Sequence, residues 1–231
     1  KPEAIRDWAS LSDDERRLFA RQAEVFAAFT EYTDHEIGRM FQAIGDLGEL
    51  DNTLILFLGD NGYFFGEHGL GPERRFAYEE GIRAPFVARF PGRIKAGSRR
   101  KELVILQDIA PTVFQLAGGK PGPQIQGRSL LPLFAGAKRP GAGWRKSFLA
   151  EYWAENAMPW LVGMTYKCVR TDRYKYIRWV NRGRNGELDE LYDLDRDPYE
   201  VTNVIRRPAY RPVRDRLQRE LRRLAVEAMG L

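Results

Sequence analysis

The chain contains 231 residues, of which 43% are hydrophobic and 30% are charged. This length and apolar content allow one large packed domain, or one and a half of ordinary size, and indicate a globular chain. The formal net charge of +5 comes from 37 basic and 32 acidic side chains, so it is a modest excess over many charges of both signs. Such an excess is only a weak indication of an anionic partner.

Cysteine content and hydropathy exclude further classes. Cys168 is the one cysteine, so neither an intrachain disulfide nor a thiolate metal cluster can form. It lies in an alternating, strand-like run, which favours a buried free thiol. No signal-peptide pattern and no apolar span of about 18 residues is visible in these residues, and we expect no membrane partner. Because the chain begins with Lys1, we expect that an N-terminal part is missing, which leaves a periplasmic or secreted location open.

The first half of the sequence predicts a layered α/β core. Ser12 opens a capping-box pattern, and apolar residues recur at helical spacing as far as Leu47, which predicts one long helix or two with a break. The continuous apolar run at residues 53–58 is typical of a strand buried on both faces of a sheet. Residues 86–90 predict a second buried strand, and residues 107–117 predict a helix.

A segment rich in glycine and proline, residues 120–143, surrounds a short helical piece at 129–134 and is the best candidate for a boundary. We therefore predict a core portion at residues 1–136 and a subdomain at residues 137–231. In the subdomain, alternating or aromatic-rich runs at 147–153, 162–170 and 175–180 predict an antiparallel meander with a turn at 182–186. The predicted fold class is α/β, followed by a small antiparallel α+β subdomain.

The end of the chain is strongly basic. Eight arginines fall between Arg206 and Arg223, and apolar residues recur there at helical spacing, namely Val213, Leu217, Leu221 and Leu224. This pattern predicts an amphipathic helix with a solvated basic face. Because no aromatic pattern for base stacking accompanies it, we expect no nucleic-acid partner.

Potential metal ligands follow the first predicted strand directly. Asp60 and Asn61 stand at its carboxyl end, where open α/β sheets place their ligand crevices. One anionic and one neutral oxygen ligand suit a hard divalent cation such as Ca²⁺ or Mg²⁺, which would need further carboxylates from elsewhere. Asp-Asn-Gly is also a common turn sequence, and taken alone it favours a turn.

Two basic positions follow within a few residues. His68, flanked by Glu67 and Gly69, is a candidate proton donor or anion contact. Arg74 and Arg75 are candidates for clamping a tetrahedral anion, because guanidinium pairs well with sulfate or phosphate oxygens. Each signal is weak alone, since loop histidines and paired arginines are more often solvated surface residues. The other histidine, in the predicted helix, is assigned to structure.

The order and spacing of these pieces resemble the sulfatase family, within the wider alkaline-phosphatase-like superfamily. Asp60-Asn61-Gly62 is followed by Gly66-Glu67-His68-Gly69, and Arg74 stands four residues before Tyr78. Similar agreement extends over nearly the whole chain, at residues 32–39, 78–85, 108–112 and 190–203. The specificity lies in the series and not in any one match.

The resemblance implies roles for the matching residues. Asp60 and Asn61 match one pair of metal ligands for a divalent cation, usually Ca²⁺, although Mg²⁺ is also possible. Arg74 stands where sulfatases commonly carry a sulfate-contacting lysine. His68 matches a histidine near the sulfate or the leaving group of bacterial members. Both are therefore expected to be catalytic and substrate-binding, and the expected partner is a sulfated small molecule or glycan.

Besides the arginine at position 74, the chain departs from the family pattern in two respects. The Cys/Ser-x-Pro-x-Arg motif whose first residue is oxidised to formylglycine is absent, and so is an earlier pair of acidic ligands. Cys168 has no proline two residues later and cannot be that nucleophile. The sequence therefore resembles the C-terminal part of a sulfatase, and we expect formylglycine in the missing N-terminal part and no turnover by this chain alone.

Two alternatives stay open. A phosphodiesterase or phosphonate monoester hydrolase of the same superfamily would use an overlapping metal centre and basic clamp. A non-catalytic module for acidic glycans would instead use the basic helix and aromatic residues of the meander, namely Trp153, Trp160, Tyr174, Tyr176 and Trp179.

Overall fold

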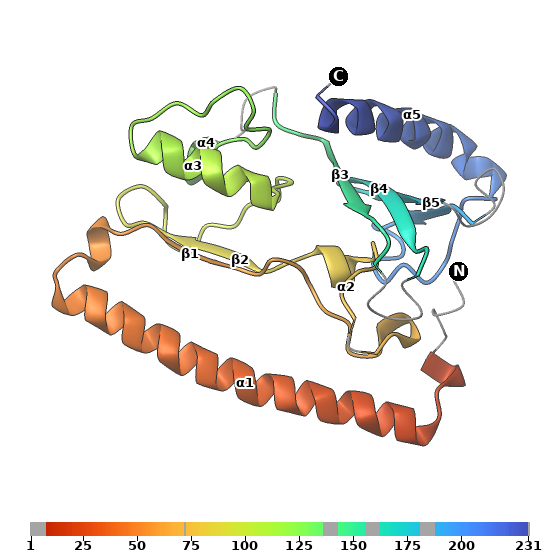
Figure 1. Cartoon of the computed structure of the whole chain (residues 1–231), viewed down its shortest axis with the longest axis horizontal. Helices are drawn as coiled ribbons and strands as arrows, with labels where there is room; N and C mark the ends of the chain where they lie inside the picture. Colours follow the sequence, from red (N-terminus) through yellow and green to blue (C-terminus); the bar gives the residue numbers. More distant parts are fainter. Residues whose placement is uncertain (1–7, 72, 136–142, 156–161, 181–187, 231) are drawn as a thin grey trace. The chain divides into compact units, whose positions relative to one another are not determined.

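The computed structural model of the chain describes residues 8–71, 73–135, 143–155, 162–180 and 188–230. Figure 1 labels its helices and strands in chain order. The chain forms two compact units. One consists of Lys1–Glu24, Asn61–Ala84 and Lys146–Leu231, and the other of Val25–Asp60 and Pro85–Arg145. The predicted boundary at residue 136 lies outside the described residues.

The long helix α1, Asp13–Asp46, is continuous. Of the two predicted alternatives, one long helix is therefore confirmed over two helices with a break. The capping box is present, since Ser12 N donates to Glu15 Oε2 at 2.8 Å and Glu15 N donates to Ser12 Oγ at 3.2 Å. Phe19 is the buried residue of this helix. Most of its other large apolar side chains are exposed, including Phe29 at 68% and Met40 at 63%.

Strands β1, Ile55–Leu58, and β2, Phe86–Arg89, form a two-stranded antiparallel sheet in which Leu58 pairs with Phe86. Both strands were predicted, but the expectation that they are buried on both faces is wrong, because Phe57 is 48% exposed and Val87 is 61% exposed. The reason is that the two strands pair antiparallel, and such a sheet can leave one face open to solvent. Phe57 and Val87 are cross-strand partners on the same face. Their apolar runs are therefore only partly covered.

The same unit contains α3, Ile109–Leu116, and α4, Leu131–Phe134, close to the predicted helical positions. Asp108, fully buried just before α3, anchors them. Its carboxylate accepts hydrogen bonds from the backbone N–H of Arg128 at 2.7 Å and from Arg145 Nη2 at 2.6 Å. A buried carboxylate is stable here because charged and backbone donors satisfy it.

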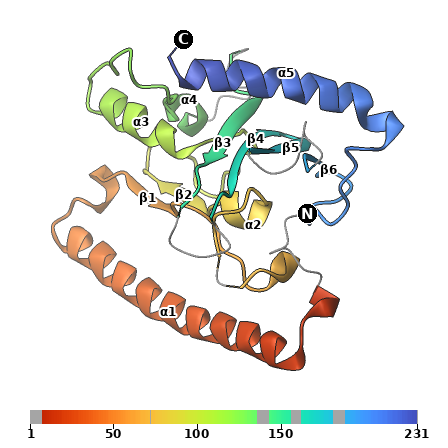
Figure 2. The ribbon, with the colours of Figure 1, turned by 45° about the vertical axis from the view of Figure 1, so that its right-hand side comes forward.

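The other unit is built on a four-stranded antiparallel sheet in the order β3-β4-β5-β6. The strands are β3, Ser147–Tyr152; β4, Thr165–Thr171; β5, Tyr174–Val180; and β6, Glu190–Asp193. This confirms the predicted meander, whose turn at 182–186 lies outside the described residues. Helix α5, Arg211–Ala228, lies along one face of the sheet, and α2, Glu79–Ile82, belongs to the same unit (Figure 2).

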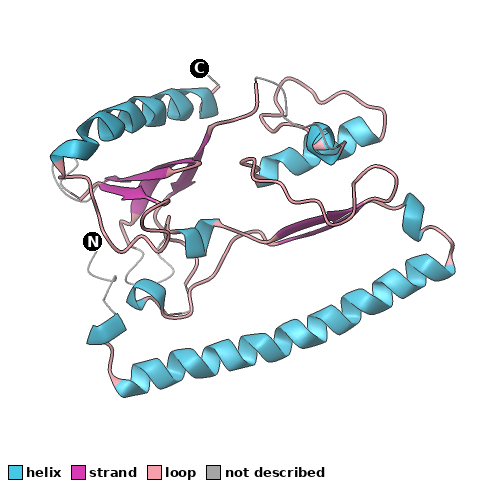
Figure 3. Ribbon diagram, turned by 180° about the vertical axis from the view of Figure 1, so that it is seen from behind, coloured by secondary structure: helices cyan, strands magenta, loops and turns pink. Residues whose placement is uncertain are grey.

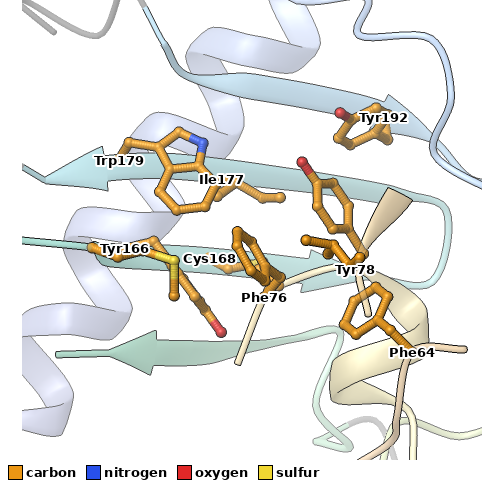
Figure 4. Packing of buried hydrophobic residues seen from close by; sticks show 11 residues of the cluster. Phe64, Phe76, Tyr78, Tyr166, Cys168, Ile177, Trp179 and Tyr192 are labelled. Carbon is orange, nitrogen blue, oxygen red and sulfur yellow. The ribbon is translucent and has the colours of Figure 1, made fainter. Parts of the chain in front are cut away.

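The alternation of the strands divides this unit into two cores. Val169, Tyr176 and Leu191 point to one face and pack against Leu217 and Leu221 of α5. On the other face, the aromatic cluster gathers side chains from the strands and from residues 64–78, as Figure 4 shows: Phe64, Phe76, Tyr78, Tyr166, Cys168, Ile177, Trp179 and Tyr192. Because strand side chains alternate with a period of two, neighbours in the sequence enter opposite cores.

Two predictions are decided by this alternation. Cys168 is a buried free thiol, as expected. The prediction that Tyr176 and Trp179 belong to an aromatic surface for glycan binding is wrong, because these side chains are only 0% and 4% exposed. Trp160 lies outside the described residues, whereas Trp153 is 62% exposed. Figure 3 shows the sheet from behind, with α5 along it.

Candidate functional site

The loop after β1 is anchored on both sides of the pair Asp60-Asn61. Before the pair, Gly59 N donates to Pro85 O at 3.1 Å, and after it, Gly62 N donates to Gly81 O at 2.9 Å. A Cβ added at Gly62 would lie 2.0 Å from the carbonyl oxygen of Glu80, so only glycine fits against α2. Gly59 is thus tied to Pro85 within one unit, and Gly62 is packed closely against α2 within the other.

The side chains of Asp60 and Asn61 leave oxygen atoms available. Asp60 is exposed and enters no ion pair within the described part of the chain. Asn61 Nδ2 donates to Gly62 O at 2.6 Å, so its Oδ1 is left to accept or to coordinate. A carboxylate beside an amide oxygen is the donor chemistry of a hard divalent cation. Two ligands are too few, and among the described residues no group of three or more acidic, His or Cys side chains completes a site.

His68 occupies a strained backbone position. Its φ of 56° is left-handed, a conformation that non-glycine residues adopt rarely. The side chain is 4% exposed, and its ring stacks on Tyr78 with a centroid distance of 4.2 Å. Nε2 lies 3.5 Å from Glu80 Oε2, at the long limit of a hydrogen bond. Burial tends to raise the pKa of Glu80, but the nearby His68 outweighs it and holds that pKa below its ordinary value.

Behind His68, the aromatic cluster contains one buried carboxylate. Glu190 accepts hydrogen bonds from Tyr78 Oη at 2.9 Å, Tyr192 Oη at 2.5 Å and Trp179 Nε1 at 3.1 Å. Burial first, and then the charge of Glu190, raise the pKa of Tyr78 well above its usual range. Glu190 on β6 therefore holds Tyr78, which stacks on the His68 ring, against the sheet.

A buried ion cluster fixes the start of α2, next to these residues. Lys175 on β5 is 0% exposed, and its Nζ lies 2.9 Å from Glu79 Oε1 and 2.8 Å from Glu200 Oε1. Arg170 Nε contacts Glu79 Oε1 at 2.9 Å, and Glu200 Oε2 accepts from the backbone N–H of Glu79 at 2.6 Å. These contacts join α2 to the sheet and to residue 200, which itself has a left-handed φ of 53°.

The two carboxylates of this ion cluster have opposite protonation tendencies. Burial raises the pKa of Glu200 to about 7, although Lys175 opposes the shift. Glu79 is also penalised by burial, but Arg170 and Lys175 outweigh that penalty and lower its pKa to about 2. Glu79 is thus ionised at neutral pH, whereas Glu200 titrates there.

The adjacent arginines of the sequence have different surroundings. Arg75 contacts Glu73 at 3.2 Å and Glu155 at 3.3 Å. Glu73 Oε1 also accepts from the backbone N–H of Arg74 at 2.7 Å. The guanidinium of Arg74 is exposed and has no ion pair among the described residues. Of the two arginines, Arg74 is therefore the one available to an external anion.

Sequence reasoning missed the residues that support the site, above all Glu79, Lys175, Glu190 and Glu200. Only one signal pointed to them. Lys175 and Glu190 stand inside or at the edge of apolar strand runs, where a charged residue that faces a core must have a partner. The residues that pair with them are distant in the sequence, and no local sequence pattern identifies those partners.

Family models and known proteins match this chain over most of its length. The family model described as Sulfatase matches residues 3–119, and the model described as N-sulphoglucosamine sulphohydrolase, C-terminal, matches residues 66–227. The chain belongs to the sulfatase family. The N-acetylglucosamine-6-O-sulfatase of Bacteroides thetaiotaomicron is 36% identical to this sulfatase chain over 199 residues, which cover 84% of the chain. The chain spans 33% of that relative's length.

Solved structures share the fold of this sulfatase chain. One was determined in complex with its substrate D-glucosamine-2-N,6-O-disulfate. It has a TM-score of 0.74 and 34% identity, and the match covers 85% of this chain and 38% of the other. The phosphonate monoester hydrolase of Agrobacterium radiobacter has a TM-score of 0.72 and 27% identity, with 84% and 39% covered. The layered α/β fold class is thereby confirmed. In the described part of the chain, every helix is too short or too polar to cross a membrane.

Proposed function

We propose that this chain is part of a sulfatase that hydrolyses sulfate esters of glucosamine-type sugars. The observation that carries the proposal is the 36% identity to an N-acetylglucosamine-6-O-sulfatase over most of the chain. The solved relative with bound D-glucosamine-2-N,6-O-disulfate supports the same class of substrate. The chain covers only part of each relative, so the activity is proposed for the longer protein that contains it.

Asp60 and Asn61 are proposed to bind a divalent cation, Ca²⁺ or Mg²⁺, with ligands from outside this chain. The amide oxygen of Asn61, which is left to coordinate, and the exposed carboxylate of Asp60 support this assignment. A cation held there would supply Lewis-acid stabilisation of the charge that develops on the sulfate oxygens. Because a site with two ligands is incomplete, the chain alone is proposed to be inactive and to bind the cation weakly.

Arg74 is proposed to contact the sulfate directly. Its exposed guanidinium has no ion pair among the described residues and presents a planar donor set that matches a tetrahedral oxyanion. For His68, the prediction of a catalytic, substrate-binding contact stays a prediction. Its 4% exposure and its stacking on Tyr78 also equip it to hold the loop that carries the site.

The nucleophile is proposed to be a formylglycine that this sequence does not contain. Cys168 does not fit the role, because burial raises the pKa of its thiol to about 12 and the side chain is inaccessible to substrate. The residues of this chain are therefore assigned to binding and orienting the sulfate, and to stabilising charge on it.

The test uses the longer protein encoded by the complete reading frame. We expect hydrolysis of N-acetylglucosamine-6-sulfate, lost on removal of divalent cations and restored by Ca²⁺. Asp60→Ala should raise the cation concentration needed for half-maximal activity. Arg74→Ala should lower kcat/KM by roughly 100-fold, as expected for loss of a charge-stabilising donor. The matched control is Arg99→Ala, another exposed arginine without an ion pair among the described residues, which should be neutral.

A second candidate function is supported by the similarity to a phosphonate monoester hydrolase. Sulfate and phosphonate esters both present tetrahedral oxyanions that a cation and an arginine bind alike. The two functions are separated by comparing kcat/KM for an aryl sulfate and an aryl phosphonate monoester with the same leaving group. A preference for the phosphonate would replace the sulfatase proposal.

A further inference from the structure

The positive charge of this protein is concentrated in its last segment. Residues 206–231 contain eight arginines, three acidic residues and no lysine, which gives a net charge of +5. The whole chain also has a net charge of +5, so the charges of all preceding residues balance. Such localisation distinguishes a basic surface from an ordinary mixed one.

Helix α5 presents part of this charge away from the sheet. Its apolar side chains Leu217 and Leu221 are buried against the sheet. With about 100° between successive residues of a helix, Arg211, Arg219 and Arg222 fall on the opposite side. All three are exposed. We call these three residues the arginine face.

The acidic residues of the helix do not neutralise the arginine face. Asp215 pairs with Arg214 at 2.9 Å, and Glu220 pairs with Arg223 at 2.7 Å. Arg223 also contacts Glu227. The arginines that keep no ion pair within the described residues are Arg206, Arg207, Arg211, Arg216, Arg219 and Arg222.

We propose that the arginine face, together with Arg206 and Arg207, binds a polysulfated carbohydrate chain. This inference rests on the proposed function, in which the substrate is a sulfated sugar. The surface lies on the face of the sheet opposite to the aromatic cluster, which includes Phe64 and Phe76 from the loop that carries His68 and Arg74. It is therefore a separate contact, which would hold a polymer at other sulfate groups than the one bound by Arg74.

The chemistry of the surface suits a row of tetrahedral oxyanions such as sulfate groups. Every basic residue is an arginine, whose planar fork donates two parallel hydrogen bonds to a sulfate group. From Arg211 to Arg222 the helix rises by about 16 Å, so the row can follow an extended polyanion. The helix α5 has no aromatic residue on which bases could stack, which argues against single-stranded nucleic acid.

The test measures binding of the 231-residue chain to heparin by calorimetry over a range of NaCl concentrations. We expect binding that weakens with salt. In Arg211→Gln/Arg219→Gln/Arg222→Gln, the affinity should fall roughly tenfold or more and the salt dependence should become shallower, because fewer counterions are released. Glutamine keeps helix propensity, so circular dichroism should be unchanged. The charge-matched control is Lys95→Gln/Arg99→Gln/Lys120→Gln, three exposed side chains in the other unit, which should bind like the wild type.

Two results would overturn the proposal. If the triple variant and its charge-matched control lose the same affinity for heparin, the loss is a general effect of net charge. Equal binding of desulfated heparin or of a DNA duplex would show that sulfate is not recognised. Heparin binding by this chain and hydrolysis of N-acetylglucosamine-6-sulfate by the longer protein are separate measurements, so failure of one proposal leaves the test of the other unaffected.

Discussion

Replacing Lys175 by methionine should destabilise the protein strongly, because it removes the cation of a buried cluster. The ammonium lies within 2.9 Å of both Glu79 and Glu200, and its side chain is 0% exposed. Methionine has a similar volume, so the change acts mainly on charge. Glu79 keeps Arg170 as a partner, whereas Glu200 loses its only ion pair among the described residues.

The size of the effect follows from this geometry. At about 2.9 Å and an effective dielectric constant of 20, each contact is worth roughly 6 kcal/mol before desolvation is subtracted. Breaking one partner of a buried pair typically costs about 3 to 5 kcal/mol. Because the pKa of Glu200 is already about 7, this carboxyl can protonate in the variant near neutral pH. The loss should therefore be larger at pH 8 than at pH 5.

The assay is urea unfolding of the wild type and of Lys175→Met at pH 5, 7 and 8. The matched control is Lys167→Met on the neighbouring strand, whose partner Glu151 lies at 2.7 Å but whose ion pair is about a quarter exposed. A pair of that kind contributes about 1 kcal/mol or less. If Lys175→Met loses no more free energy of unfolding than Lys167→Met, or loses more at pH 5 than at pH 8, the reasoning is refuted.

Three further predictions concern single positions. Since the folded-state pKa of Glu200 is raised to about 7 from 4.5, this group makes the protein less stable as pH rises from about 5 to 7, by at most about 3 kcal/mol. Glu200→Gln should remove that slope in urea unfolding, and an unchanged slope would contradict the assignment. Gly62→Ala should cost about 2 to 3 kcal/mol because its Cβ would meet the carbonyl oxygen of Glu80. The control is Gly38→Ala in helix α1, where an added Cβ would have no atom within 4 Å, so this change should be neutral or stabilising. Equal shifts in melting temperature for the two variants would refute the steric argument. Calorimetry should detect weak Ca²⁺ binding by this chain or none, whereas micromolar binding abolished by Asp60→Ala would show a complete site.

Local pattern predicted the elements of this fold well. Three correct predictions depend only on residues a few positions apart. They are the capping box at Ser12, the alternation of side chains between the two faces of the strand that contains Cys168, and the helical spacing of apolar residues around Leu217. Such patterns can be read from the sequence because helix and strand periodicity extends over only a few consecutive residues. For the same reason the buried thiol and the amphipathic end of the chain were predicted correctly.

Burial on a sheet could not be predicted in the same way. The run at 53–58 is apolar enough for a strand covered on both faces, yet Phe57 is half exposed. Burial of a strand face depends on which other segments of the chain pack against it. The apolar composition of the strand indicates only that such burial would be favourable.

The sequence by itself determined the secondary structure, the family and the order of the candidate ligands, since each is written in residues close together. Only the tertiary structure decided which of them are buried and which are free: His68 is packed on Tyr78, while Arg74 and not Arg75 is open to an anion. It also revealed the ion cluster, in which Glu200 reaches the backbone of Glu79 across 121 positions of sequence. Contacts over such separations depend on the closed fold, because a side chain gains or loses its solvent and its partners only when distant segments meet.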